Sequence, residues 1–250
     1  MPNAFLLVSD EFARDAAILR HFEKHRVATD NKLCALTTFP TKKDWGMDLW
    51  AGHPDVEYFT HLAADIRAAE NEHIFALVTL FREDNPLYPW TAQFKGLKPG
   101  KLVARFIGEI GDPYLQTTGK HKPPRQKEPI TEPRVRTFNE LKHLVGVAPM
   151  GGKIPMHIGH LQNSFKDRAR TRLWLITDQL VKQHDSTYYP IFTAGVIKYA
   201  REEYRGVDKK GVPWNDARFA VVGRKRARIL VGVAFLEGLY REARRLHEES

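Results

Sequence analysis

The spacing of hydrophobic residues near the N-terminus predicts amphipathic helices. Phe12, Ala16 and Leu19 recur at helical intervals, so we expect a helix over residues 11–25. A second helix is expected over residues 54–69. Helices with one apolar face need another layer of structure to cover that face.

Three hydrophobic segments predict the strands of that layer. Residues 73–81 form an almost unbroken apolar run, which is typical of a buried central strand. Residues 101–110 alternate between apolar and polar positions, as in a strand with one solvent-exposed face. Residues 4–9 predict a shorter strand. The order of helices and strands predicts an α/β (α+β) fold with a mixed sheet in its N-terminal part. A ferredoxin-like arrangement is one topology that fits this order.

The helical period dominates the C-terminal part of the chain. Helices are expected over residues 138–143, 161–182, 196–204 and 215–248, the last with Asn215 as its N-cap. Short strands are expected over residues 144–148 and 188–192, and Pro190 would place the second at a sheet edge. The sequence therefore predicts a basic, mostly helical C-terminal part.

Four prolines lie between positions 123 and 133, and they forbid a helix there. They predict three parts: a mixed α/β domain over residues 1–118, a basic proline-rich segment over residues 119–136, and the helical part over residues 137–250. The middle segment can be an arm that follows a phosphate backbone or a plain linker.

Charge is distributed unevenly between the two halves of this chain. The net charge is +9, but residues 1–118 carry 13 basic and 16 acidic residues, whereas residues 119–250 carry 26 basic and 14 acidic residues. Such an excess repels itself unless a polyanion is the usual partner, and nucleic acid is the commonest polyanion. A basic surface kept for solubility and a scaffold or inhibitor that docks an acidic protein are the alternatives.

Three basic clusters are the expected phosphate contacts. They comprise Lys120, Lys122 and Arg125 in the proline-rich segment, Lys166, Arg168, Arg170 and Arg172 on a predicted helix, and Arg224, Arg226 and Arg228 on the last helix. Aromatic residues near strands and basic helices, such as Trp90, Phe94 and Tyr188, would stack on unpaired bases or would pack in the core. The stacking interpretation, and the lack of a convincing recognition helix, favour single-stranded RNA over DNA.

One histidine lies inside the basic segment and suggests RNA cleavage. His121 between Lys120 and Lys122 could act as a general acid or base, while the cations stabilise the transition state. A metal-independent endoribonuclease is therefore one interpretation, and a solvated loop histidine is the other.

The predicted order of elements is similar to that of CRISPR RNA endonucleases, which pair ferredoxin-like sheets with basic surfaces. Their C-terminal glycine-rich loop is absent here.

A second histidine pattern predicts nucleotide chemistry. The run His157-Ile158-Gly159-His160 resembles the signature of the HxGH nucleotidyltransferase superfamily, which includes class I aminoacyl-tRNA synthetases and NMN adenylyltransferases. The resemblance implies that His157 and His160 face an α-phosphate at a helix N-terminus and that Gly159 permits its close approach. No second signature of that superfamily is present. A nucleotidyltransferase is thus the alternative enzyme.

Several classes of protein are excluded by composition. The single cysteine, Cys34, can form no internal disulfide and leaves no cysteine-based zinc site. The longest apolar runs are too short to span a membrane, and the N-terminus lacks the basic region of a signal peptide. No metal site, dinucleotide fingerprint or Walker loop is found, so no cofactor is expected. A cytoplasmic protein of undetermined oligomeric state is the expectation.

Overall fold

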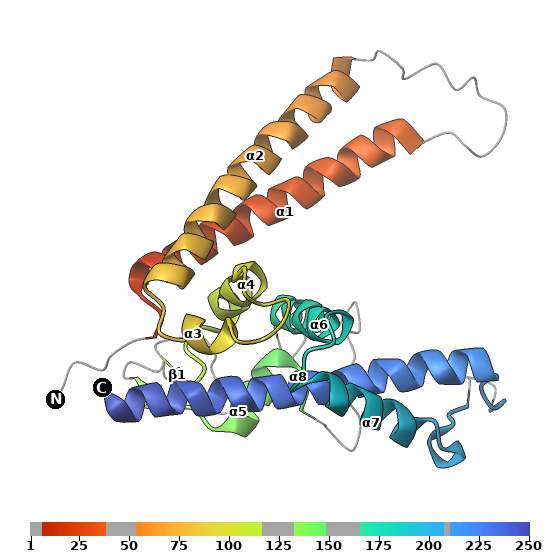
Figure 1. Cartoon of the computed structure of the whole chain (residues 1–250). Coiled ribbons are helices and arrows are strands. Elements are labelled where there is room, and N and C mark those ends of the chain that lie inside the picture. Colours follow the sequence, from red (N-terminus) through yellow and green to blue (C-terminus); the bar gives the residue numbers. More distant parts are fainter. Residues whose placement is uncertain (1–6, 39–53, 117–132, 149–165, 208–210) are drawn as a thin grey trace, which may run out of the picture. The chain divides into compact units, whose positions relative to one another are not determined.

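The structure, a computed structural model, describes residues 7–38, 54–116, 133–148, 166–207 and 211–250. Within these ranges the chain is mostly α-helix, and the one sheet contains two strands of two residues each. Figure 1 shows how the helices follow one another along the chain. The predicted mixed sheet is therefore wrong, and so is the ferredoxin-like arrangement built on it.

The chain forms two compact units, which are described separately here. One contains residues 10–80, and the other contains residues 1–9 together with residues 81–250. The predicted boundaries after residues 118 and 136 remain predictions.

The smaller unit is a pair of long helices (Figure 1). It consists of α1 (Asp10–Thr38) and all but the last turn of α2 (Pro54–Glu83). The Arg26 guanidinium joins the two helices, because its Nε lies 2.5 Å from a Glu70 carboxylate oxygen. This hydrogen bond raises the pKa of Arg26 above its ordinary value. The Phe22 and His73 rings stack with their centroids 5.2 Å apart, so polar and aromatic contacts both hold the pair together.

The predicted central strand at residues 73–81 is the second half of α2. Ile74, Leu77 and Phe81 are buried at helical spacing, whereas the Phe75 side chain between them is 74% exposed. An apolar run with one exposed aromatic residue has the same composition as a buried strand. The helical period becomes visible only once the exposure of Phe75 is known.

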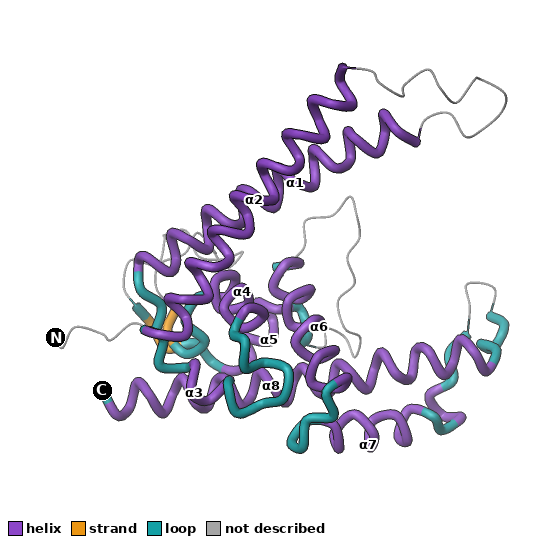
Figure 2. Tube along the Cα trace, turned by 45° about the horizontal axis from the view of Figure 1, so that its top comes forward, coloured by secondary structure: helices purple, strands orange, loops and turns teal. Residues whose placement is uncertain are grey.

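In the larger unit α8 (Asp216–Glu249) is the longest described helix, and several of the other helices pack against it (Figure 1). The helix α7 (Tyr189–Tyr199) runs beside its first half, and α6 (Asp167–Lys182) crosses it near the middle (Figure 2). Small residues permit these close crossings. A Cβ atom on Gly195 would lie 3.0 Å from the Cβ of Ala227, which leaves no room for a larger side chain.

The aromatic core of this unit lies where α3 (Tyr88–Thr91) meets the second half of α8. The Trp90 ring lies 4.9 Å from Phe94 and 5.7 Å from Phe235, and the Tyr188 ring lies 5.0 Å from Phe94. Burial raises the pKa of the Tyr188 hydroxyl. Of the two interpretations that the sequence left open for Trp90, Phe94 and Tyr188, core packing is therefore correct.

The three remaining predicted strands within the described residues are also wrong. Residues 101–110 form the helix α4 (Lys101–Ile110), because Val103, Phe106 and Ile110 are buried together on one side. Residues 188–192 enter α7, where Pro190 lies in the first turn and needs no N–H group. Residues 144–148 contain the end of α5 (Phe138–Val145) and a turn.

Local signals located the two helices that the sequence predicted best. The last helix begins after Asn215, whose side chain accepts a hydrogen bond of 2.9 Å from the backbone N–H of Arg218. The predicted helix at residues 138–143 is α5. Both predictions are confirmed. The helix predicted at 161–182 is confirmed from Asp167 onward, and residues 161–165 lie outside the described ranges.

The strands β1 (Leu115–Gln116) and β2 (Arg134–Val135) pair antiparallel, with Leu115 opposite Val135. They lie at the two ends of the segment that contains most of the predicted basic arm. The root of that segment is therefore held to the larger unit, next to α5.

A capping box fixes the start of α5. The Thr137 hydroxyl accepts from the Glu140 N–H at 3.2 Å, and the Glu140 carboxylate accepts from the Thr137 N–H at 2.8 Å. Arg134 binds the same carboxylate at 2.8 Å and, as the largest contribution, holds the pKa of Glu140 below its ordinary value. This stabilisation is therefore present above pH 4.5, the ordinary pKa, and is lost as pH falls through the lowered pKa of the folded protein.

Replacing Thr137 with alanine should lower the free energy of unfolding by about 1 kcal/mol at neutral pH. The Glu140 N–H loses its acceptor, and the Glu140 carboxylate loses the hydroxyl that helps to orient it toward the backbone N–H of residue 137. Urea denaturation followed by circular dichroism would measure the change. A Thr171→Ala variant on the exposed side of α6 is the control, and an equal loss in both variants would contradict this role for Thr137.

Candidate nucleic-acid interface

Two basic helices contain all of the predicted contact residues that the structure describes. Lys166, Arg168, Arg170 and Arg172 lie at the start of α6, and Arg224, Arg226 and Arg228 lie in the first half of α8. The other predicted site residues, Lys120, His121, Lys122, Arg125, His157 and His160, lie outside the described residues.

The start of α6 brings several cations close to α4. The Lys166 ammonium donates to the Glu109 carbonyl oxygen at 2.8 Å, and Arg168, Arg170 and Arg172 are half-buried. Arg105 of α4 is near enough to Arg172 for their charges to interact. Burial and, to a smaller extent, the charge of Arg172 lower the pKa of Arg105 to about 10. Both guanidinium groups remain charged at neutral pH, so this region holds positive charge at some electrostatic cost.

The arginines on the first half of α8 have different environments. Arg224 is exposed, and its Nε lies 3.4 Å from the Ala220 carbonyl oxygen of its own helix. Arg226 instead donates to the Tyr204 carbonyl oxygen at 3.0 Å and lies over the rings of Tyr199 and Trp214. Arg226 therefore holds together the end of the α7–α8 pair, whereas Arg224 faces solvent.

Arg228 is fixed from several sides. Its Nη2 lies 3.3 Å from a carboxylate oxygen of Asp178, and its guanidinium lies 5.7 Å from the Trp174 ring centroid and 5.4 Å from that of Phe192. The side chain is 22% exposed. The cation is thus held in one orientation, and water still reaches it.

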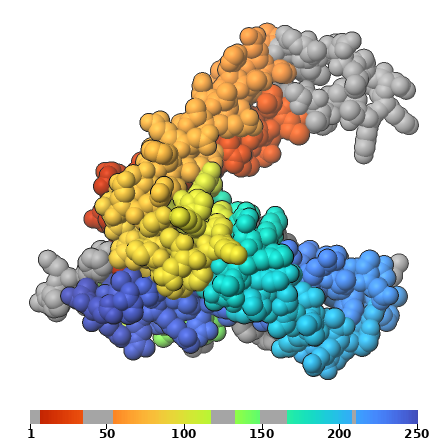
Figure 3. Space-filling model, in the orientation of Figure 1, coloured from red at the N-terminus to blue at the C-terminus, as the bar shows by residue number. Residues whose placement is uncertain are grey.

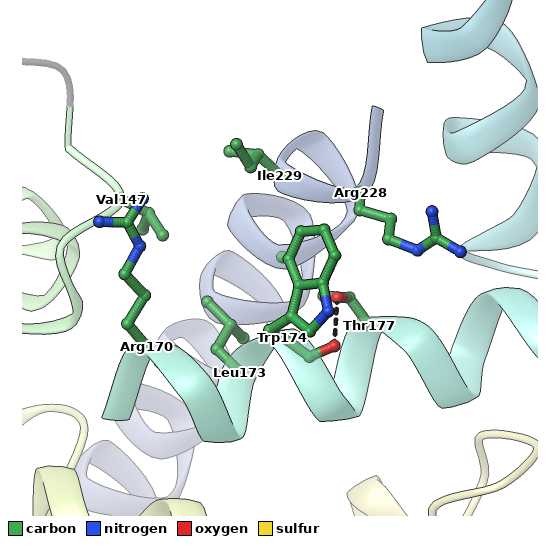
Figure 4. A pocket seen from close by; sticks show the side chains of 8 residues that line it. Val147, Arg170, Leu173, Trp174, Thr177, Arg228 and Ile229 are labelled. Atoms are coloured by element: carbon green, nitrogen blue, oxygen red, sulfur yellow. Dashed lines mark hydrogen bonds between the residues drawn. The ribbon is translucent and has the colours of Figure 1, made fainter. Parts of the chain in front are cut away.

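A small depression lies between α6 and α8, with Arg170 and Arg228 on its rim (Figure 4). Its volume is about 60 Å³. Small-molecule and cofactor sites usually enclose roughly 300–1,000 Å³. The depression is therefore too small to enclose a nucleotide, although its rim can contact part of one. Its lining consists of Val147, Arg170, Leu173, Trp174, Thr177, Arg228, Ile229 and Gly232.

Trp174 was not predicted from the sequence as a site residue, although it is 37% exposed beside these cations. Its spacing of four residues from Arg170 was the available signal, because residues so spaced share a helix face. The aromatic residues that the sequence suggested for stacking, Trp90, Phe94 and Tyr188, belong to the core instead.

Positive charge is neutralised along the second half of α8. Arg244 lies 2.7 Å from Glu248, and Arg245 lies 2.7 Å from Glu242. Both glutamates accept hydrogen bonds that raise the pKa of these arginines above the ordinary value. Arg241 pairs with Glu237 in the same way. The first half of α8 has no comparable row of glutamates in its sequence.

The surface of α6, α7 and the first half of α8 is continuous in Figure 3, where these helices are teal to light blue. Exposed basic residues on this surface include Arg218, Arg224 and Lys225 of α8. The half-buried arginines of α6 belong to the same packed group of helices. We call α6 together with residues 216–236 of α8 the basic helical surface.

The elements around the histidine motif differ from those that the superfamily resemblance implies. Residues 144–148, expected as the preceding strand, are the end of α5 and a turn. Residues 188–192, expected as the following strand, are helical. The Lys166 N–H donates to the Leu144 carbonyl oxygen at 2.8 Å, so the described residues before and after positions 149–165 lie next to one another. That place is close to Val147 and Arg170 of the depression.

The described part of the chain contains neither a metal-ligand cluster nor a membrane-spanning helix. No group of three histidine, cysteine, aspartate or glutamate side chains there could hold a metal ion. None of the described helices combines the length and apolar character that a membrane span requires.

Comparison with known proteins found no match: the sequence matches no protein-family model, no curated protein and no solved structure.

Proposed function

We propose that this protein binds single-stranded nucleic acid through the basic helical surface. The supporting observation is the contrast within α8. Residues 216–236 contain five basic residues and one acidic residue, whereas residues 237–249 contain three arginines and four glutamates. A helix that neutralises arginines in one half and concentrates them in the other is suited to a polyanion at the basic end.

The shape of the surface favours a single strand. The partly exposed indole of Trp174 offers a surface on which an unpaired base can stack, and the nearby guanidinium groups can contact phosphates. The preference for RNA that the sequence suggested depended partly on Trp90, Phe94 and Tyr188 as stacking residues, and these three pack in the core. RNA is therefore the first ligand to test, with DNA of the same sequence beside it. Cleavage by His121 or His157 depends on residues outside the described ranges and remains a hypothesis from the sequence.

The experiment is fluorescence anisotropy with a labelled 15-nucleotide single-stranded RNA at low salt. The proposal predicts binding with a dissociation constant in the micromolar range or below, since nonspecific binding is about 10⁻⁴–10⁻⁶ M at physiological salt and strengthens as salt is lowered. A duplex of the same sequence should bind more weakly, because its bases cannot stack on the protein. Polyglutamate is the competitor that tests the alternative of an acidic protein partner. Absence of RNA binding at low salt would contradict the proposal.

A further inference from the structure

Trp174 occupies an unusual position among the aromatic residues of the larger unit. Trp90, Phe94, Tyr188 and Phe235 contact one another in the core. Trp174 instead stands at the depression between α6 and α8, and 37% of the residue is exposed (Figure 4). An indole that is partly exposed beside an apolar depression has a ring surface on which a ligand can stack.

The floor under the indole is rigid. The helices α6 and α8 meet at Gly232, where an added Cβ would lie 3.2 Å from Thr177 and 3.3 Å from Leu173. Thr177 donates its hydroxyl to the Trp174 carbonyl oxygen at 2.8 Å, which adds to the helical hydrogen bonds at this position (Figure 4). The helix segment that carries the indole is therefore packed in place before any ligand arrives.

Arg228 supplies a cation that is already oriented. Asp178 and the Phe192 ring hold its guanidinium beside the indole. Its Nε is buried and has no hydrogen-bond partner among the residues that the structure describes. The guanidinium lies over the Trp174 ring, 5.7 Å from its centroid, so a base that stacks on the exposed part of the indole would have a fixed cation beside it.

Arg170 supplies a second cation at the opposite side of the indole (Figure 4). Burial lowers its pKa, so its charge is partly removed from water. An anion placed there would be attracted more strongly than at a fully hydrated arginine. In Figure 4 the indole lies between the two arginines, an order that suits a base with a phosphate on either side.

We infer that Trp174, Arg170 and Arg228 form a stacking subsite for one unpaired base of a bound strand. The inference rests on the proposed function and adds the group that is recognised. The base lies against the exposed part of the indole, since the depression, at about 60 Å³, is too small to enclose it. Stacking of this kind is tolerant of base identity, so purines and pyrimidines should both bind.

The test compares Trp174→Leu with wild type on two ligands of equal charge. One is a 12-nucleotide single-stranded RNA, and the other is a 12-residue abasic phosphodiester strand. Loss of one stacked base should weaken RNA binding about tenfold, since each stacked base contributes roughly 1–3 kcal/mol. Binding of the abasic strand should change less than twofold. Leu175→Ala is the matched control, because Leu175 has the same exposed fraction of 37% on the same helix.

Trp174→Phe keeps an aromatic ring and should retain RNA affinity within about threefold of wild type. It also removes one fluorophore, so quenching of intrinsic fluorescence by RNA should be smaller than in wild type. This measurement remains available if Trp174→Leu does not fold. Equal RNA affinity in wild type and a folded Trp174→Leu variant, or unchanged quenching in Trp174→Phe, would overturn the subsite alone. Failure of both strands to bind wild type would instead overturn the proposed function.

Discussion

Replacing Asp112 with alanine should lower the free energy of unfolding of the larger unit by about 3–5 kcal/mol, because several backbone N–H groups would lose a buried acceptor at roughly 1–3 kcal/mol each. The Asp112 side chain is 1% exposed and lies 2.8 Å from the His247 Nε2. It also accepts backbone hydrogen bonds from Tyr114 at 2.8 Å and Leu115 at 2.9 Å, and from Leu7 at 3.3 Å. Its removal would leave several buried donors without an acceptor.

Asp112 matters because it connects distant parts of the chain. It joins the end of α8, the start of β1 and Leu7, which lies near the N-terminus. The β1–β2 pair is the root of the segment that carries the predicted basic arm. Loss of Asp112 is therefore expected to loosen both the last turns of α8 and that root.

Urea denaturation of Asp112→Ala and of a control variant measures this effect. Asp216→Ala removes an aspartate that is 92% exposed and should cost no more than about 1 kcal/mol. Asp112→Asn keeps an acceptor oxygen for the backbone N–H groups and should fall between the two. Equal stability of Asp112→Ala and Asp216→Ala would show that the carboxylate does not hold these segments together.

Reversing Arg168, Arg170 and Arg172 to glutamate should weaken single-stranded RNA binding on the order of 100-fold. Each ion pair at contact distance is worth about 1 kcal/mol in water, so three lost pairs correspond to roughly that factor before repulsion is counted. The fold should tolerate the change, because a carboxylate at position 172 would approach the buried charge of Arg105.

A matched control separates local contacts from total charge. Reversal of Arg241, Arg244 and Arg245 to glutamate changes the net charge equally, in a region where these arginines are already paired with glutamates. Anisotropy titrations of both variants at the same salt give the comparison. The account predicts less than a fivefold loss for the control. Similar losses in the two variants would mean that the basic helical surface is not the binding site.

Parts of the fold could be predicted because their signals are local. Asn215 and the Thr137–Glu140 pair lie at helix starts that a reader of the sequence can identify, since capping depends on neighbouring residues only. The strand predictions failed where tertiary packing decides. Phe75 is exposed on α2, and Pro190 lies in the first turn of α7, although each fits a strand pattern equally well.

The candidate surface could be predicted in outline but not in detail. The excess of arginines identifies α6 and the first half of α8 without any coordinates. The different environments of Arg226, which holds Tyr204, and Arg228, which pairs with Asp178, depend on segments 22 and 50 residues away. The exposure of Trp174 likewise depends on how α6 crosses α8.

The salt dependence of single-stranded RNA binding tests the central claim most directly. Each neutralised phosphate on a single strand contributes roughly −0.7 to the slope of log affinity against log salt. Contacts from the basic residues of α6 and of the first half of α8 together predict a slope steeper than about −3. A slope near zero, or no measurable binding at low salt, would contradict the account.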